Sequence, residues 1–96
     1  MRGKTNVYNS KVSGEKLHLT LTTNQPTHTD IMGAIITVSY EDTTETYTWN
    51  NSQLIINIPY NVDYTVSFGN VDGYKSPDSF SYTSKIGNNR FIEAVY

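Results

Sequence analysis

The side chains best suited to acid–base or metal chemistry are few in this chain and widely spaced. The two histidines, His18 and His28, are ten positions apart, one on the outward side of an expected strand and one in a Thr-rich loop. A zinc site needs three or four converging ligands, and the chain has no cysteine to add to these histidines. We therefore interpret both histidines as solvated side chains and predict no metal site.

Carboxylates gather in two expected turns. The first turn holds Glu41, Asp42 and Glu45, and the second holds Asp72 and Asp78. Calcium takes six to eight oxygen ligands, and neither turn has the Asp-x-Asp-x-Asp-Gly run that arranges them. Hydrolysis by paired carboxylates needs a cleft that the pattern does not indicate, and no Gly-x-Ser-x-Gly elbow for a nucleophile is present. We expect no catalytic residue and no cofactor, and therefore no enzyme.

Aromatic side chains offer a different chemistry, the stacking of sugar rings or contact with a protein ligand. Tyr47 and Trp49 share one face of an expected strand, where they form either a platform or part of the core. Aromatic residues supply much of the buried area of a small domain, which favours the core for Trp49. Tyr60 and Tyr74 lie in expected loops and are better placed for exposed contact. The candidate ligand-contact residues are thus Tyr47, Trp49, Tyr60 and Tyr74.

Charge and hydropathy exclude two classes of partner. The formal net charge is -2 with a pI near 5.5, and the seven Lys and Arg residues are scattered, so we expect no nucleic-acid binding. No apolar run approaches the ~20 residues that a membrane helix needs, so we expect no direct membrane insertion. Residues 1–14 also lack the apolar centre of a signal peptide.

The elements that must position these side chains are strands. In the most regular stretch, Val62, Tyr64, Val66 and Phe68 alternate with polar residues, which puts the large apolar groups on one face. Seven such segments are expected, at 15–22, 32–40, 44–50, 53–58, 63–68, 79–84 and 90–96. Their spacing of about 8 to 12 residues is typical of an all-β sandwich.

Local signals refine this pattern at several positions. Leu17, Leu19 and Leu21 should face inward, in what reads as an outer strand covered on one side. Pro59 cannot donate to a ladder, so the fourth strand should stop there. Gly33 and Ala34 are expected at a close backbone approach or a bulge. Residues 1–14 read as a leader or linker, with a short strand near Val7 as an alternative, and residues 15–96 as one module.

Three stretches resemble a known family of modules. Asp30–Val38, Tyr47–Trp49 and Ile58–Phe68 are similar to the Ig-like, prealbumin-like modules that occur in tandem in bacterial surface proteins. The carboxypeptidase regulatory-like and PEGA-type domains belong to this group. Gly73-Tyr74 and the final strand follow in the corresponding order, so the resemblance covers about Leu17 to Tyr96. Where the family has Gly before its Tyr run, this chain has Asn61, the next best residue at positive φ.

The resemblance implies a seven-stranded antiparallel Ig-like (Greek-key) β-sandwich, and it leaves the strand order open between Ig-like and prealbumin-like. Fibronectin type III domains, the nearest rival family, share the Pro-then-Tyr pattern. In their tyrosine corner the hydroxyl bonds nearby backbone, a role for which Tyr64 is the candidate.

The function that we expect is a non-catalytic structural or adhesion module of a larger bacterial cell-surface or phage-fibre protein. Its partners would be neighbouring domains of the same chain, and a protein or glycan ligand. The location would be extracellular or at the cell surface, with the virion surface as the alternative, and we expect the chain to be one module of a longer protein. Two other hypotheses are a carbohydrate-binding module, and edge-strand association through Glu15–Thr22 or Arg90–Tyr96.

Overall fold

Residues 13–24 and 31–96 are described by the computed structural model, and in this part of the chain the regular structure is entirely β. The seven strands are β1 Ser13–Thr22, β2 Ile35–Tyr40, β3 Thr43–Thr48, β4 Leu54–Pro59, β5 Asp63–Phe68, β6 Phe80–Thr83 and β7 Asn89–Val95. The prediction of an all-β fold is confirmed. The predicted leader or linker lies outside the described residues except for Ser13 and Gly14, and so does the alternative strand near Val7.

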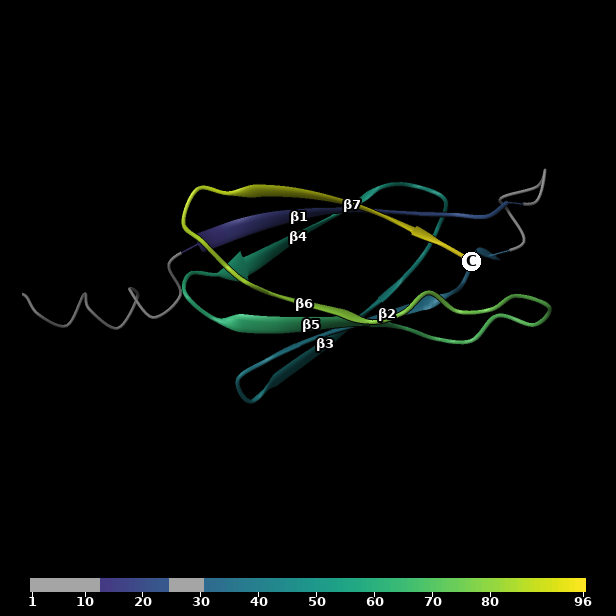
Figure 1. The fold of residues 1–96 in the computed structure, drawn as a ribbon, viewed down its shortest axis with the longest axis horizontal. Coiled ribbons are helices and arrows are strands. Elements are labelled where there is room, and N and C mark those ends of the chain that lie inside the picture. The colour runs from purple at the N-terminus through teal and green to yellow at the C-terminus, as the bar shows by residue number, and fades with distance from the viewer. Residues whose placement is uncertain (1–12, 25–30) are drawn as a thin grey trace, which may run out of the picture.

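The strands form two sheets that lie one above the other (Figure 1). One sheet has three strands in the order β4-β1-β7, and the other has four in the order β3-β2-β5-β6. Pairing is antiparallel except between β1 and β7, which are parallel. The prediction of antiparallel pairing throughout is therefore wrong for this pair. A parallel pair cannot be closed by a hairpin, and here the connection between the two strands is the whole of β2 to β6.

The position of β1 also differs from expectation. The sequence suggested an outer strand and a free edge at Glu15–Thr22, but β1 lies in the centre of its sheet, between β4 and β7. Both of its backbone edges are thus occupied, and edge association through Glu15–Thr22 is ruled out. The strands with a free edge in the described sheets are β3, β4, β6 and β7.

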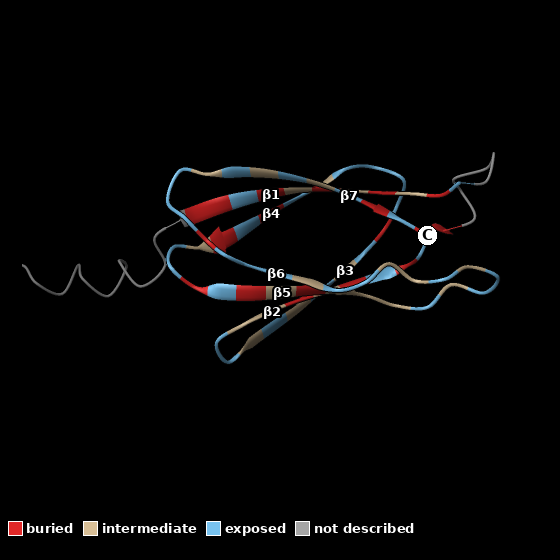
Figure 2. Cartoon of the chain, viewed as in Figure 1, coloured by how far each residue is buried: buried red, intermediate tan, exposed pale blue. Residues whose placement is uncertain are grey.

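The core lies between the inward faces of the two sheets, which appear in red in Figure 2. Leu17, Leu19 and Leu21 face inward from β1, as predicted from their alternation. The other fully buried apolar side chains of the strands are Ile36 and Val38 on β2, Ile56 and Ile58 on β4, and Tyr64 and Val66 on β5. Because both sheets contribute to one cluster, each sheet protects the apolar face of the other from water.

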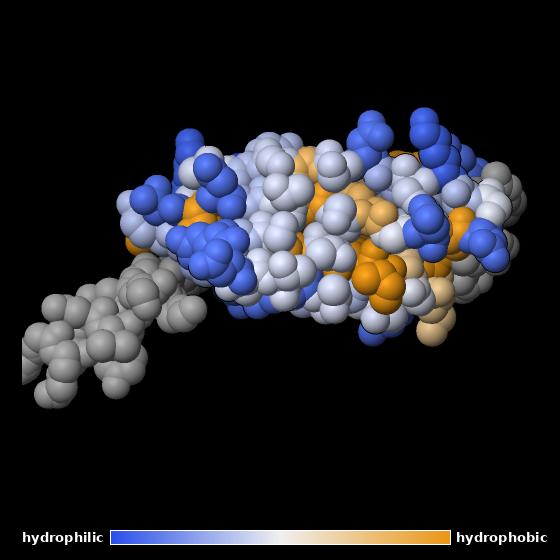
Figure 3. All heavy atoms as spheres, turned by 90° about the horizontal axis from the view of Figure 1, so that it is seen from below, coloured by the Kyte–Doolittle hydropathy of each residue, from blue (hydrophilic) through white to orange (hydrophobic). Residues whose placement is uncertain are grey.

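The outer face of the four-stranded sheet carries mostly hydroxyl side chains. In the cross-strand register these are Thr37, Ser39, Thr44, Thr46, Thr48, Thr65, Ser67 and Ser81. Figure 3 views this side and shows mostly pale surface of intermediate hydropathy, with hydrophilic groups gathered toward the two ends and several hydrophobic groups between them. Threonine suits this position because its branched side chain fits the pleat while its hydroxyl stays in water.

Turn chemistry explains where several strands end. Pro59 is the last residue of β4 and Asn61 has φ 62°, so both predictions for this turn are confirmed. Glu41 and Asp42 form the acidic turn between β2 and β3, and Glu41 has φ 50°. Gly33 has φ 94°, and a Cβ there would meet nothing within 4 Å. The predicted close approach at Gly33 is wrong, since only its backbone conformation favours glycine.

Candidate functional site

The predicted aromatic platform of Tyr47 and Trp49 does not form on the surface. Trp49 is 3% exposed and belongs to the core, as aromatic packing in a small domain favours. Its Nε1 has no hydrogen-bond partner among the described residues. Tyr47 is half-buried, and its hydroxyl donates to Oε1 of Glu45 at 2.8 Å. Burial, followed by this hydrogen bond, raises the pKa of Tyr47 to about 12.

Tyr60 and Tyr74 lie at opposite ends of β5. Tyr60 is 49% exposed in the turn between β4 and β5. Tyr74 is half-buried in the connection from β5 to β6, where its side chain packs against the core and its backbone N–H donates to the Val71 carbonyl. The structure therefore does not bring the four predicted contact residues together in one surface.

An exposed aromatic group occurs instead at a position that the sequence did not single out. Phe91 on β7 is 69% exposed and stacks on His18 of β1, with ring centroids 4.3 Å apart and an interplanar angle of 14°. His18 is half-buried, and its Nε2 lies 3.1 Å from Oδ1 of Asn89. The register places Ile55 of β4 on the other side of His18. Ile55, His18 and Phe91 thus lie side by side across the outer face of the three-stranded sheet.

The largest polar cluster of the described residues surrounds a buried carboxylate, that of Glu15 on β1. Its side chain is fully buried, and it accepts hydrogen bonds from three residues of other elements. Arg90 of β7 donates from Nε to Oε2 at 2.8 Å, and Asn88 donates from Nδ2 to Oε1 at 2.7 Å. The Tyr64 hydroxyl of β5 donates to Oε2. We call Glu15, Tyr64, Asn88 and Arg90 the Glu15 cluster.

This arrangement corrects the predicted tyrosine corner. Tyr64 is buried, as that role requires, but its hydroxyl bonds the Glu15 carboxylate of the facing sheet rather than nearby backbone. Burial, followed by this hydrogen bond, raises the pKa of the Tyr64 phenol. Glu15 has the same parity along β1 as Leu17 and Leu19, so the sequence held a signal that this carboxylate points into the core.

Opposing influences act on the pKa of Glu15. Burial alone would raise it, since an ionised carboxylate is costly away from water. Hydrogen bonds from Arg90, Tyr64 and Asn88 outweigh that influence, and the pKa lies below its ordinary value of 4.5. The carboxylate is therefore ionised at neutral pH with its oxygens already bonded, an arrangement suited to holding elements together rather than to moving protons.

A second connection at this end of the molecule involves Ser84, which is buried just after β6. Its Oγ accepts a hydrogen bond from the Glu15 N–H at 3.1 Å, and its backbone bonds Asn61 and Val62. Gly14 packs against the same group, since a Cβ at Gly14 would lie 2.5 Å from the Ser84 Oγ. Both sheets are thus tied together where β1 and β5 begin.

The acidic turns contain no cluster of buried, hydrogen-bonded carboxylates comparable to the Glu15 cluster. Glu41, Asp42, Asp72 and Asp78 are exposed, and Glu45 accepts the Tyr47 hydroxyl. Within residues 13–24 and 31–96, no group of three or more His, Cys, Asp or Glu side chains is arranged to hold a metal ion. The prediction for His28 lies outside the described residues.

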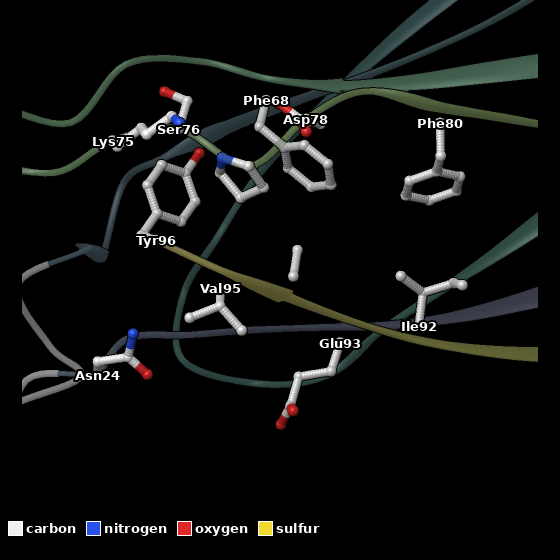
Figure 4. Close-up of a pocket in the computed structure, with 12 residues that line it drawn as sticks. Asn24, Phe68, Lys75, Ser76, Asp78, Phe80, Ile92, Glu93, Val95 and Tyr96 are labelled. Carbon is white, nitrogen blue, oxygen red and sulfur yellow. The ribbon is translucent and has the colours of Figure 1, made fainter.

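A cavity of about 580 Å³ opens between β7 and the segment that leads into β6 (Figure 4). The rings of Phe68 and Phe80 point into it from one sheet and Ile92 points into it from the other, while Glu93 points away. Tyr96 closes one end, where its hydroxyl donates to the Gly69 carbonyl at 2.8 Å. The cavity lies on the side of the molecule where both sheets end, one in β6, which carries Phe80, and the other in β7, which carries Ile92.

Comparisons with protein-family models, with curated proteins and with solved structures gave no match to this chain. The described residues also contain no helix with the length and hydropathy needed to cross a membrane.

Proposed function

We propose that this protein is a non-catalytic structural or adhesion module that transmits mechanical load within a larger bacterial cell-surface or phage-fibre protein. The observation that carries the proposal is the direct parallel pairing of β1 with β7. The register runs without interruption from Lys16 opposite Asn89 to Thr22 opposite Val95. Neighbouring domains of the same chain would be its partners, and its location would be extracellular or at the cell or virion surface.

Parallel pairing determines how tension would act on the molecule. The N-terminal end of β1 and the C-terminal end of β7 lie at opposite ends of the pair (Figure 1). A force that pulls these two ends apart slides one strand along the other. The ladder hydrogen bonds then resist together, instead of breaking one after another as they would when strands are peeled from one end.

The Glu15 cluster adds side-chain bonds across the same pair of strands. Arg90 and Asn88 hold Glu15 from the β7 side, and Tyr64 holds it from the other sheet. Sliding β1 past β7 would separate Glu15 from these donors and leave a buried carboxylate unpaired, which costs about 3–5 kcal/mol. The cluster therefore opposes the motion that tension would drive.

The family assignment forms part of the proposal. Immunoglobulin constant domains pair their first strand with the second, in an ABED sheet that faces a CFG sheet. Here β1 pairs with β4 and β7 instead. Of the two alternatives that the sequence resemblance left open, we therefore propose the prealbumin-like form of the Ig-like, Greek-key sandwich, a module used in tandem.

Single-molecule pulling in two geometries tests the mechanical role. The chain has no cysteine, so pairs of introduced cysteines can serve as unique attachment points. We expect a clearly higher unfolding force when the load runs from residue 13 to residue 95 than when it is applied to Lys16→Cys and Asn89→Cys. The second pair lies at one end of β1 and β7 and peels them apart. Equal forces in both geometries would contradict the proposal.

The alternative of a carbohydrate-binding module has less support. Trp49, its main predicted platform, is in the core, and exposed Tyr60 is separated from Tyr47 and Tyr74. Retention of the protein on a glycan array, lost on Tyr60→Ala substitution, would restore this alternative.

A further inference from the structure

We propose that the free edge of β7 binds an extended segment of another polypeptide as a fourth strand of the β4-β1-β7 sheet. Apolar side chains of that segment would fill the cavity beside Phe68 and Phe80. This inference goes beyond the load-bearing role, which depends on the opposite edge of β7, where β1 is bound.

The backbone of β7 has hydrogen-bonding groups available along its free edge. In a parallel ladder, alternate residues direct both N–H and C=O to the same neighbour. The Asn88 carbonyl accepts from Lys16 at 2.9 Å and the Tyr96 N–H donates to Thr22 at 2.8 Å, so even-numbered residues face β1. The N–H and C=O groups of Phe91, Glu93 and their odd-numbered neighbours therefore point away from β1.

Two of the three other edges of the described sheets carry features that discourage strand addition. β6 is only four residues long and β4 ends at Pro59, while β3, like β7, has no proline or lysine. Unlike β7, β3 does not line the cavity beside Phe68 and Phe80. β7 has seven residues without proline or lysine, and the positive charge of Arg90 is engaged by Glu15. Short length, proline and lysine are common protections of an edge strand, so β7 is the edge that both lacks these protections and borders the cavity in the described sheets.

Both faces of β7 indicate what the added strand should carry. On the inner side, Ile92 and Ala94 border the cavity, so alternate residues of the segment should be apolar and would enter it. On the outer side the strand would lie beside exposed Phe91 and Glu93. The described residues place no cation in an ion pair with Glu93, which points away from the cavity, whereas the cavity itself is lined by both Asp78 and Lys75 and favours neither sign of charge. A basic residue at an outward position is therefore the complementary partner.

A second copy of this chain fits the edge less well. Antiparallel self-pairing centred on Phe91 would place Arg90 of one copy opposite Ile92 of the other, beside the cavity. Pairing centred on Glu93 would set two carboxylates against each other. Pairing centred on Ile92 would fill neither copy's cavity, because each Ile92 already borders the cavity of its own copy. We therefore assign the edge to a different polypeptide.

Peptide binding tests this assignment. The probes are capped seven-residue peptides in which valine, isoleucine, leucine or phenylalanine at the inward positions alternates with threonine and one lysine. Binding is followed by NMR chemical-shift changes of the intact chain, which we expect at β7 and at residues 75–80. A peptide of the same composition without alternation should bind at least tenfold more weakly.

Backbone bonding is tested separately from the side chains. Glu93→Pro removes one outward N–H without removing a bond to β1, and Glu93→Ala is the matched control that keeps this N–H. We expect Glu93→Pro to weaken peptide binding about three- to tenfold relative to Glu93→Ala, as the loss of a hydrogen bond predicts. N-methylation of every second peptide amide can be done in two ways, on the odd or on the even positions. Only the set whose N–H groups point toward β7 should weaken binding similarly. Circular dichroism and melting of both variants establish that the fold is kept.

Three results would overturn the proposal. The first is no binding by any member of the peptide set, and the second is equal binding by the alternating and non-alternating peptides. The third is self-association of the unliganded chain that Glu93→Pro abolishes, because the occupant would then be a second copy. None of these results bears on the pulling experiment, so the two proposals succeed or fail independently.

Discussion

Arg90 donates from Nε to Oε2 of Glu15 at 2.8 Å, and this ion pair joins two strands whose residues are 75 positions apart. The two partners differ in their access to water. The Glu15 side chain is 0% exposed, whereas that of Arg90 is 24% exposed and lies over the Tyr82 ring at 3.8 Å. Removing Arg90 therefore leaves the fully buried charge of Glu15 without a partner. Removing Glu15 leaves the charge of Arg90, which water can still reach.

This asymmetry predicts that Arg90→Ala destabilises the fold more than Glu15→Gln. We expect Arg90→Ala to cost about 3–5 kcal/mol, the range for leaving a buried charge without its partner. For Glu15→Gln we expect about 2 kcal/mol, as for lost hydrogen bonds to a charged group, since partly exposed Arg90 can turn to solvent. Urea unfolding followed by circular dichroism measures both values, and the reverse order would contradict this account of the pair.

The Tyr64 hydroxyl makes a second prediction possible, because Tyr47 provides a matched control. Each phenol donates to a carboxylate, but Tyr64 is 1% exposed and Tyr47 is only half-buried. Tyr64→Phe should cost about 1.5 kcal/mol, as for a buried hydrogen bond to a charged group. Tyr47→Phe should cost less, about 0.5 kcal/mol, because its hydroxyl is only partly buried. Equal losses in the two variants would show that burial of the cluster contributes nothing.

The lowered pKa of Glu15 predicts a specific loss of stability in acid. Its pKa in the folded protein lies below the ordinary value of 4.5, so the ionised form favours folding. This contribution is fully present above pH 4.5 and disappears as the pH falls through the folded-state value. Unfolding free energies of the wild type and Glu15→Gln, measured from pH 7 to pH 2, should therefore converge below pH 4.5. A constant difference across this range would contradict the assignment.

Burial of Trp49 predicts its fluorescence, which is unambiguous because the chain has one tryptophan. Emission should be blue-shifted and weakly quenched by acrylamide until the protein unfolds, and oligosaccharides should leave it unchanged. Trp49→Ala should cost about 3–5 kcal/mol, as for truncation of a large core side chain. Exposed Tyr60→Ala is the control and should be nearly neutral. Strong quenching of the folded protein would contradict the burial of Trp49.

Gly14 gives a test of the close packing where β1 begins. An added Cβ would lie 2.5 Å from the Ser84 Oγ and 2.6 Å from the Tyr60 Cα, and backbone cannot move aside as a flexible side chain can. Gly14→Ala should therefore lower the melting temperature by several degrees, as about 1–3 kcal/mol of overpacking implies. At Gly69 the nearest atoms would be 3.4 Å from the new Cβ, so Gly69→Ala should have little effect.

Local structure was predictable because its causes are local. Alternation over Asp63–Phe68 located that strand to the residue, and Pro59 and Asn61 defined the turn before it. A period of two reports only that one face is buried. It does not report how many neighbours a strand has, which is why β1 was expected at an edge and lies in the centre of its sheet.

The candidate site was harder to predict because it depends on pairing between distant segments. Tyr60 was correctly expected on the surface, but nothing local indicates that Phe91 stacks on His18, since the two meet only through the β1–β7 register. Glu15 did carry a signal in its parity. That parity could identify an inward carboxylate, but not the arginine, 75 positions away, that neutralises it.

The pairing of β1 with β7 also has a consequence for the order of folding. The β2–β3 hairpin joins neighbouring segments and can form early, while the three-stranded sheet needs the last strand of the chain. During synthesis, Glu15 emerges among the first residues of the fold, but Asn88 and Arg90 are made last. A nascent chain that lacks β7 would have to bury this carboxylate without its cation. We therefore expect the domain to remain open on the ribosome until β7 has emerged, and then to close in one cooperative step.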